Sequence, residues 1–255
     1  MNAFANPFTN QVVAITGGST GIGLATAQAF LAAGAKRVYI TGRNAKSLDA
    51  AVSQLGERAI AVVSDVAKLA DIETLKSAIE SHGDQLDVVF ANAGIAENNG
   101  FGNTSEAEFD KTFDINVKGM FFTVQTLLPL LKDGGSVVLT ASIVANKGMP
   151  NLSLYNASKA AVRSFARSWA NDLKGRKIRV NAVSPGYTRT PIFENGLKMD
   201  ESQIAAFYEH AKQAVPLGYV AQPEEIAPAV LFLASPAASY VNGIEFTLDG
   251  GLAQV

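Results

Sequence analysis

The chain has 255 residues, of which 48% are hydrophobic and 17% charged, and its formal net charge is -2. This length can bury a sizeable core, while the composition excludes a disordered chain and offers no basic surface for a nucleic acid. We therefore expect a globular protein whose partner is a small molecule.

The sequence contains no cysteine, which excludes disulfides, thiolate catalysis and thiolate metal sites. Its two histidines, His82 and His210, have polar neighbours, so we expect both at the solvated surface and no metal site. Residues 1–10 lack a basic region followed by an apolar run, and no apolar stretch reaches the roughly 18 residues of a membrane span. We expect a cytoplasmic protein with no membrane partner, folded as a single domain over residues 1–255.

Short apolar segments rich in Val and Ile predict strands buried on both faces, at residues 12–15, 37–40, 59–63, 86–90, 136–139, 178–183 and 243–248. Helical periodicity marks the segments between most of them, at residues 22–33, 45–55, 69–82, 105–131 and 152–173. Strands alternating with helices of this length predict right-handed crossovers and an α/β fold, with a parallel sheet covered on both sides.

The first predicted strand ends in a glycine-rich turn, Thr16-Gly17-Gly18-Ser19-Thr20-Gly21-Ile22-Gly23. Glycines there permit a tight turn, close approach of the backbone to a pyrophosphate and close packing of the following helix, whose positive end would face the phosphate. The spacing Gly-x-x-x-Gly-x-Gly departs from the more familiar dinucleotide fingerprint, so a plain glycine-rich turn stays open. The candidate cofactor residues are Gly17, Ser19, Thr20, Gly21, Ile22 and Gly23.

The same turn also satisfies Gly-x-Ser-x-Gly, the nucleophile elbow of an α/β-hydrolase. A hydrolase is the less favoured alternative, because the elbow would fall on the first strand. The only late histidine, His210, lies in a polar segment.

The second predicted strand ends at Thr41-Gly42-Arg43-Asn44, where none of the four residues is acidic. Dinucleotide-binding folds that use NAD place an acid near this point for the ribose 2′-hydroxyl, whereas an arginine accommodates the 2′-phosphate of NADP. NADP is therefore favoured, with Arg43 and Asn44 as contacts; an ordinary surface arginine is the alternative.

Three more polar positions follow in chain order. Asp65, followed by Val66, either accepts a hydrogen bond from an adenine amino group or caps the next helix. Asn92-Ala93-Gly94 ends the fourth strand, at the sheet edge where open α/β folds bind ligands. Asn116 lies in an apolar stretch, and since a buried amide needs partners, it either braces the neighbouring strand, which is favoured, or holds a water.

Tyr155 and Lys159 are four residues apart, so a helix presents them on one face. Two charges about 4 Å apart interact by on the order of 4 kcal/mol at an effective dielectric near 20, which could lower the tyrosine pKa by up to ~3 units. Such a phenol suits general acid and base catalysis. An interfacial aromatic beside a solvated lysine is the alternative that this spacing alone leaves open.

Together these motifs resemble the short-chain dehydrogenase/reductase family over about Phe8 to Val255, in order and approximate spacing. The resemblance is carried by the glycine turn, Asn92-Ala93-Gly94, Asn116, Ser142, Tyr155 with Lys159, Asn181, Pro185-Gly186 and Asp249-Gly250-Gly251. It implies a Rossmann-type doubly wound sheet of about seven strands, usually assembled as a homotetramer.

The resemblance also implies roles. Tyr155 would protonate the carbonyl oxygen in reduction and act as the base in oxidation, and Ser142 would hydrogen-bond that oxygen. Lys159 would bind the nicotinamide ribose, and Asn116 would position a water that links Lys159 to solvent. The nicotinamide end would be held by Pro185, Gly186, Thr188 and Thr190.

A narrower likeness is to bacterial NADPH-dependent alcohol dehydrogenases acting on ketones and secondary alcohols, through passages such as Phe121-Phe122-Thr123-Val124-Gln125 and Pro191-Ile192. One departure is Tyr219, where Pro-Leu-Gly is usually followed by arginine. The predicted substrate residues are Ile143, Val144, Ala145, Asn151, Leu152, Tyr187 and Phe207, with a mobile amphipathic lid, or a surface helix with a buried stripe, at about 191–214.

Because most of these residues are apolar, a hydrophobic ketone is favoured. The runner-up is 3-oxoacyl-carrier-protein reductase, which needs basic residues near the cleft to dock an acidic carrier protein. The end of the predicted helix 105–131 supplies only Lys132. A non-catalytic NADP sensor is a remote alternative, since it has no need of the four residues Asn116, Ser142, Tyr155 and Lys159 together.

Overall fold

The computed structural model describes residues 7–255, so the first six residues of the expected domain and of the segment 1–10 lie outside the described residues. A seven-stranded sheet with the order β3-β2-β1-β4-β5-β6-β7 forms the centre, and every neighbouring pair of strands is parallel. The predicted doubly wound α/β fold is confirmed. The strands are β1 (Val12–Ile15), β2 (Arg37–Gly42), β3 (Ala59–Val63), β4 (Leu86–Ala91), β5 (Leu131–Thr140), β6 (Arg179–Pro185) and β7 (Glu245–Leu248).

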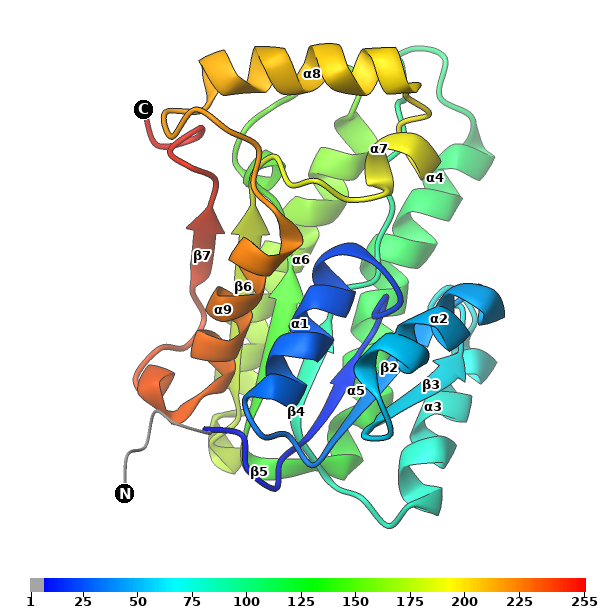
Figure 1. Cartoon of the computed structure of the whole chain (residues 1–255), viewed down its shortest axis with the longest axis vertical. Coiled ribbons are helices and arrows are strands. Elements are labelled where there is room, and N and C mark those ends of the chain that lie inside the picture. Colours follow the sequence, from blue (N-terminus) through cyan, green and yellow to red (C-terminus); the bar gives the residue numbers. More distant parts are fainter. Residues whose placement is uncertain (1–6) are drawn as a thin grey trace.

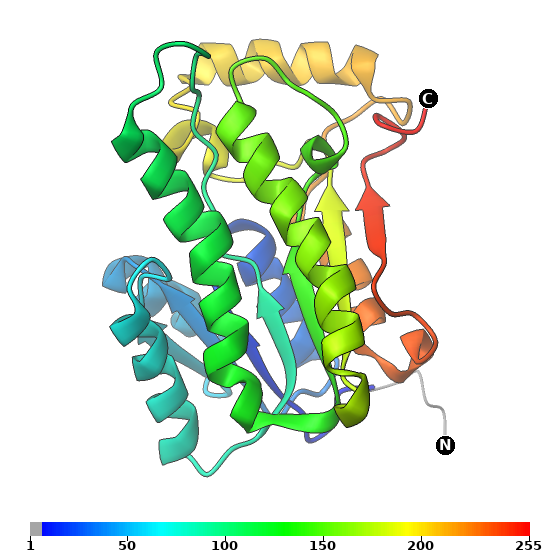
Figure 2. The ribbon, with the colours of Figure 1, turned by 180° about the vertical axis from the view of Figure 1, so that it is seen from behind.

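Helices cover both faces of this sheet. One layer consists of α1 (Gly21–Ala32), α2 (Ala45–Leu55) and α9 (Pro223–Ala234), and the opposite layer, seen from behind, of α3 (Leu69–Ser81), α4 (Glu106–Phe113), α5 (Met120–Leu127) and α6 (Ser153–Asp172) (Figures 1 and 2). Alternation along β1 sends Val12 and Ala14 into the core under α3, α5 and α6, and Val13 and Ile15 into the core under α1 and α9. Burial on both faces explains why the central strands are continuous apolar runs.

The strand order reverses at β1. The chain passes from β1 to β2 and β3 on one side, and then crosses to β4 on the other side of β1. Ligands of open α/β sheets bind in the crevice that such a reversal opens at the carboxyl ends of the strands. The glycine turn follows β1 and Asn92-Ala93-Gly94 follows β4, so both predicted motifs lie at this crevice.

The predicted helix over residues 105–131 is wrong in its continuity. α4 gives way to a π-helical segment, Asp114–Gly119, before α5 resumes, and a short 3₁₀ turn with Pro129 leads into β5 at Leu131. A Cβ added to Gly119 would lie 2.7 Å from the carbonyl oxygen of Val66, so the widened turn rests directly on the neighbouring backbone. Widened turns of this kind are common at functional sites.

Two further differences have simple causes. β7 is not buried on both faces, since it lies at the sheet edge beside β6 alone and leaves Phe246 exposed. α9 was not predicted; Pro223 at its start and Pro228 within it obscure the helical pattern, although a capping box of Gln222 and Glu225 marks its beginning. Tyr219, the departure from the family pattern, donates its hydroxyl to Glu225 at 2.8 Å.

Residues 191–214 form α7 (Ile192–Asn195) and α8 (Glu201–Ala214), which lies across the top of the molecule in Figure 1. α8 buries Ile204 and Ala211, which lie seven residues apart on one helical face, so this face packs against the protein beneath. Among residues 7–255, the structure has no helix with both the length and the apolar character that crossing a membrane requires.

Candidate active site

A cavity of about 630 Å³ lies at the carboxyl ends of the strands, reaching from the glycine turn to α8. Most of the predicted site residues line it, including Tyr155 and Lys159. The others are Gly17, Ser19, Thr20, Gly21, Ile22, Arg43, Asp65, Val66, Asn92, Ala93, Gly94, Ser142, Ile143, Val144, Leu152, Pro185, Gly186, Tyr187, Thr188, Thr190 and Phe207. Five predicted residues are not among the lining residues: Gly23, Asn44, Asn116, Ala145 and Asn151.

The glycine turn has the conformation that its composition predicts. Gly17 and Gly21 adopt positive φ angles of 64° and 53°, which L side chains rarely adopt. A Cβ on Gly23 would lie 2.1 Å from the carbonyl oxygen of Gly17, so this glycine serves close packing inside the turn rather than contact with the cavity. The turn therefore leaves its backbone exposed to the cavity at the start of α1.

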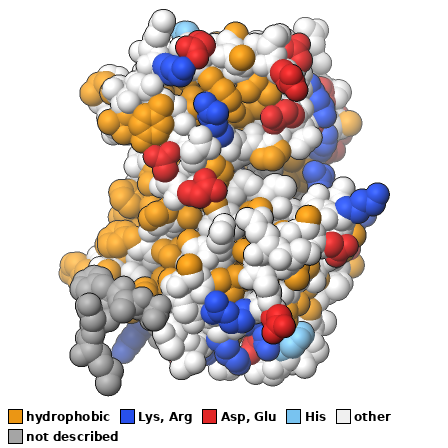
Figure 3. All heavy atoms as spheres, viewed as in Figure 1, with side chains coloured by type: hydrophobic (Ala, Val, Ile, Leu, Met, Phe, Trp, Pro, Cys, Tyr) orange, Lys and Arg blue, Asp and Glu red, His pale blue; other side chains and the backbone are white. Residues whose placement is uncertain are grey.

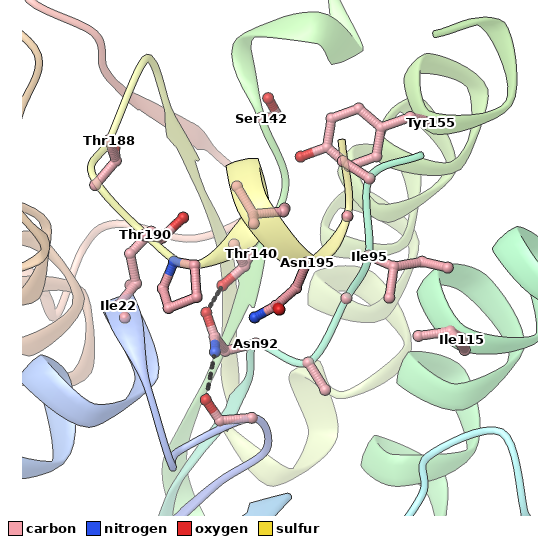
Figure 4. Close-up of a pocket in the computed structure, with 18 of the residues that line it drawn as sticks. Ile22, Asn92, Ile95, Ile115, Thr140, Ser142, Tyr155, Thr188, Thr190 and Asn195 are labelled. Atoms are coloured by element: carbon pink, nitrogen blue, oxygen red, sulfur yellow. Dashed lines mark hydrogen bonds between the residues drawn. The ribbon is translucent and has the colours of Figure 1, made fainter. Parts of the chain in front are cut away.

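Asn92 holds this turn against the sheet. Its Nδ2 donates to the carbonyl oxygens of Thr16 at 3.1 Å and Gly17 at 3.3 Å, while its Oδ1 accepts from Thr140 Oγ1 at 3.1 Å (Figure 4). One side chain thus ties together the ends of β1, β4 and β5. Asn92 acts as a brace that shapes the cavity floor.

The far end of the cavity surrounds the residues after β2 and β3. Arg43 is exposed on its wall, whereas Asn44 caps α2 by accepting from the Ser47 backbone at 3.1 Å. Asp65 Oδ1 accepts from the backbone of Ala67 at 3.1 Å, so the carboxylate stabilises the turn before α3 and also faces the cavity.

Ser142, Tyr155 and Lys159 meet in the middle of the cavity, with the hydroxyl groups of Ser142 and Tyr155 both directed into it (Figure 4). Lys159 is 3% exposed; its Nζ donates to the carbonyl oxygen of Thr140 at 2.8 Å and lies 5.7 Å from the centre of the Tyr155 ring. The predicted shared face of the helix is therefore confirmed.

The expected effect of this pair on the tyrosine is wrong. Burial raises the pKa of Tyr155 above its ordinary value of 10.0, although its hydrogen bond with Ser142 opposes the rise. Burial also lowers the pKa of Lys159 to about 8. The sequence spacing predicted that the two ionisable groups lie close together, but it could not predict their burial. Burial removes water from both groups and disfavours both ionised forms.

Asn116 lies in the π-helical segment and is fully buried. Its Oδ1 accepts from the Ile95 backbone N–H at 2.8 Å, and its Nδ2 donates to the Ile95 carbonyl at 2.9 Å and to Ser158 Oγ at 3.0 Å. The favoured prediction was that this amide braces the neighbouring strand; it instead braces Ile95, in the loop that follows β4.

Aromatic rings close the outer end of the cavity. Phe207 from α8 packs edge-on against Tyr187, with ring centres 4.7 Å apart, and at a tilt against Phe193, with ring centres 5.0 Å apart. The segment between α7 and α8 is pinned by a close approach: a Cβ on Gly196 would lie 2.3 Å from the carbonyl oxygen of Ala96. This end of the cavity is therefore apolar and framed by residues distant in sequence.

Lys111 and Glu97 line the cavity but were not predicted, whereas Asn195 and Lys198 lie within the predicted segment 191–214 without having been named individually. Lys111 and Glu97 form an ion pair of 2.6 Å, and Lys198 also lines the cavity. Asn195 extends from α7 toward Asn92 (Figure 4). Lys111 belongs to α4 and Asn195 to α7, whereas Glu97 and Lys198 lie in loops. No local sequence pattern marks their approach to the cavity, because the packing of segments distant in sequence decides it.

Both histidines are exposed, as predicted. His210 is not among the lining residues of the cavity that contains Ser19, so the structure does not form the pair that a hydrolase would need.

A family model described as "Enoyl-(Acyl carrier protein) reductase" matches residues 17–253. The chain is 41% identical to oxidoreductase asL5 of Sarocladium schorii over 249 residues, which cover 97% of each chain. It is 35% identical to a short chain dehydrogenase of Claviceps purpurea, over 95% of this chain and 96% of the other.

Two solved structures share the fold. Levodione reductase superposes with a TM-score of 0.90 at 35% identity, over 96% of this chain and 98% of that one. A 3-ketoacyl-(acyl-carrier-protein) reductase of Brucella melitensis complexed with NADH gives a TM-score of 0.86 at 30% identity, over 96% and 99% of the two chains.

Proposed function

This chain belongs to the short-chain dehydrogenase/reductase family of oxidoreductases, which act on carbonyl or alcohol substrates, and we propose that it transfers hydride between NADP(H) and ketones or secondary alcohols. The observation that carries the proposal is the meeting of Ser142, Tyr155 and Lys159 in one cavity with the glycine turn. The two curated relatives described above are fungal, so they support the family rather than the narrower likeness to bacterial alcohol dehydrogenases.

The residues of the cavity fit a nicotinamide nucleotide. The backbone of the glycine turn and the start of α1 would hold the pyrophosphate, with glycine required at positions 17 and 21 by their positive φ angles. Lys159 uses one N–H on Thr140, which leaves two for ribose hydroxyls. Thr188 and Thr190 line the opposite wall, where a carboxamide would bind. The bound nucleotide supplies the hydride.

Tyr155 and Ser142 act on the substrate oxygen. Because the pKa of Tyr155 is raised, its phenol is protonated at neutral pH and can donate a proton to the carbonyl oxygen during reduction. Ser142 would hydrogen-bond the same oxygen as negative charge develops. Both N–H donors of the Asn116 side chain are engaged, so a water relay to Lys159 would use the remaining lone pair of Oδ1 or the Asn116 main chain.

NADP is the favoured cofactor because Arg43 lines the cavity and residues 41–44 include no acid. One structural relative binds NADH, so the preference of this chain needs its own measurement. Comparison of kcat/KM for NADPH and NADH with a common ketone makes that measurement directly.

The substrate we propose is an uncharged, hydrophobic ketone. Tyr187, Phe193 and Phe207 form an aromatic wall beside Ile143 and Val144, and apolar walls of this kind select substrates by shape and burial. The structural likeness to levodione reductase supports a ketone substrate. We further propose that α7 and α8 open and close as a lid over this wall.

A 3-oxoacyl-carrier-protein substrate is the second candidate, favoured by the family-model description, by the 3-ketoacyl reductase relative and by Lys198 at the rim. Only one further lysine, Lys111, is among the lining residues at the rim, and it is paired with Glu97. A panel of aromatic and aliphatic ketones and acyl thioesters, assayed by NADPH oxidation, separates the two. Higher kcat/KM for ketones supports the first proposal, and higher kcat/KM for thioesters overturns it.

We also propose a homotetramer. Apolar side chains gather over β7 and α9 (Figure 3), where Phe232 and Phe246 pack together and remain exposed. On the opposite layer, Phe165 and Trp169 stack and stay half-buried. Two apolar surfaces on different layers suit two different two-fold contacts. Light scattering after gel filtration gives the mass that tests this assembly.

A further inference from the structure

The carboxylate of Glu245, on the edge strand β7, gathers partners from three other parts of the chain. Its Oε1 accepts from Ser184 Oγ at 2.6 Å, and its two oxygens accept from Asn146 Nδ2 at 2.9 and 2.8 Å. Arg163 Nε lies 2.5 Å from Oε2 as an ion pair, without the alignment of a hydrogen bond. The Glu245 side chain is only 10% exposed, and a carboxylate so buried requires this pairing.

The partners are close in sequence to the reacting groups. Asn146 directly follows the short turn Ile143–Ala145, which Ser142 caps by accepting from the Val144 backbone N–H. The backbone N–H of Asn146 donates to the carbonyl of Ile143 at 3.1 Å. Arg163 follows Lys159 by one helical turn and Tyr155 by two, on the same face of α6. Figure 2 shows α6 passing in front of β6, with β7 beside it.

Apolar contacts alone would not fix the orientation of the Ile143–Ala145 turn relative to α6. Ile143 and Val144 pack against Tyr155, which sets the separation of the turn from α6. Such contacts are not directional, whereas hydrogen bonds and ion pairs to one carboxylate are. Ser184, on β6, anchors that carboxylate to the sheet itself. The Ser142 turn and the Tyr155 helix therefore share one anchoring point.

We propose that Glu245 is a positioning residue that keeps the Ser142 hydroxyl at a fixed position relative to the Tyr155 phenol, an arrangement that we call the register of the two groups. Glu245 is not among the residues that line the cavity, and it acts through Asn146 and Arg163. The inference rests on the proposed function, because the register of Ser142 and Tyr155 has a kinetic effect only if they act on one carbonyl oxygen. The Ser142 hydrogen bond opposes the rise of the Tyr155 pKa, so loosening the register also raises that pKa.

The test compares Glu245→Ala and Asn146→Ala with wild type, using purified full-length protein, NADPH and the best ketone of the panel. We expect Glu245→Ala to lower kcat about 10- to 100-fold, as misplacement of reacting groups by about 1 Å does, with KM for NADPH within about twofold. The pH profile of alcohol oxidation should move to higher pH. Asn146→Ala should reproduce both effects, and the double variant should be no slower than Glu245→Ala.

Two α6 arginines provide a matched comparison. Arg163→Gln removes a partner of Glu245, whereas Arg167→Gln, one turn further along, changes an exposed arginine for which no ion pair is found among residues 7–255. Arg163→Gln should lower kcat and Arg167→Gln should not. Equal effects of the two, or a Glu245→Ala enzyme with the wild-type kcat and pH profile, would overturn the proposal. A merely structural role would lower the melting temperature without moving the profile.

Hydrogen exchange separates this inference from the proposed function. Amides of residues 143–147 should exchange faster in Glu245→Ala than in wild type, while those of β1 stay unchanged. If wild type oxidises no NADPH with any substrate, the proposed function fails; slow exchange at residues 143–147 in Glu245→Ala would then refute the anchoring by itself.

Discussion

The ammonium of Lys159 lies 5.7 Å from the centre of the Tyr155 ring and is directed to the carbonyl oxygen of Thr140, 2.8 Å away. The two ionisable groups therefore share a desolvated site, but the lysine is hydrogen-bonded to the sheet rather than to the phenol. In the protein alone, burial governs both groups: it raises the pKa of Tyr155 and lowers that of Lys159 to about 8.

Replacement of Tyr155 by Phe removes the hydroxyl and keeps the ring. Because general acid catalysis contributes about 10²- to 10⁴-fold, we expect ketone reduction to fall by that factor. NADPH binding, followed by the fluorescence of the nucleotide, should change little. Tyr240→Phe is the control, since that side chain is fully exposed and should keep wild-type activity. Reduction at the wild-type rate by Tyr155→Phe would refute the assigned acid.

Replacement of Lys159 by Met should abolish activity and yet stabilise the protein at pH 7. Burial lowers the lysine pKa from 10.5 to about 8, so keeping the charged lysine in the folded protein costs on the order of 3 kcal/mol. Methionine avoids this cost but loses the hydrogen bond to Thr140, which contributes about 1 kcal/mol. Between those pKa values the unfolded chain holds a proton that the folded chain releases, so wild-type stability rises with pH across this window.

The advantage of Lys159→Met should therefore shrink as the pH rises from 8 toward 10.5. Urea denaturation at pH 7, 8.5 and 10 measures this trend. The exposed Lys46, replaced by Met, should change the free energy of unfolding by less than about 0.5 kcal/mol at each pH. A Lys159→Met protein less stable than wild type at pH 7 would contradict the desolvation argument.

Gly42→Asp should shift the preference from NADPH toward NADH, because it places a carboxylate where a 2′-phosphate would bind and a 2′-hydroxyl could donate. A Cβ at position 42 would lie 2.9 Å from Ser19 Oγ, so Ser19 must rotate away. Gly42→Ala separates this crowding from the charge and should weaken both cofactors alike. The ratio of kcat/KM for the two cofactors is the measurement; an unchanged ratio in Gly42→Asp would remove the argument for NADP.

Asp84→Asn should destabilise the fold far from the cavity. The carboxylate accepts from Lys36 Nζ at 2.9 Å, from Arg37 and from Tyr39 Oη at 2.9 Å. Burial alone would raise the pKa of Asp84, but these donors together lower it below 3.8. Stability from this site is thus present above the ordinary carboxyl pKa and is lost as the pH falls through the lowered value.

Breaking a buried pair costs about 3 to 5 kcal/mol, so Asp84→Asn should lower the free energy of unfolding by that amount at pH 7 and by less near pH 3. Asp133, whose ion pair with Arg176 is mostly exposed, provides the comparison: Asp133→Asn should cost less than about 1 kcal/mol. Similar losses for the two variants would show that burial does not determine the cost.

Sequence patterns located the central strands because burial on both faces makes them continuous apolar runs, and the short apolar segments of the edge strands β3 and β7 located those two. Sequence patterns also located the glycine turn, whose conformation only glycine adopts readily, and the shared face of Tyr155 and Lys159, which follows from helical spacing. These features depend on residues near one another in the chain. The predictions failed where distant segments decide the outcome.

The break in the predicted helix 105–131 illustrates such a failure. Its apolar periodicity continues through residues 114–119, and the widened turn arises from contacts of Asn116 with Ile95 and of Gly119 with Val66. The raised pKa of Tyr155 has a similar origin, since the desolvation comes from surrounding loops. Lys198 and Asn195 line the cavity for a similar reason, since the packing of α7 and of the loop before α8 places them there.

The side chain of Asn116 makes the same two hydrogen bonds to the backbone of Ile95 that a residue of a neighbouring strand would make. The carboxamide presents an acceptor and a donor side by side, as a peptide group does, to both polar atoms of one residue. Aspartate lacks the donor, leucine lacks both, and glutamine is longer by one methylene. No other natural side chain of this size can thus make both contacts from position 116, although this side chain is not among those that line the cavity.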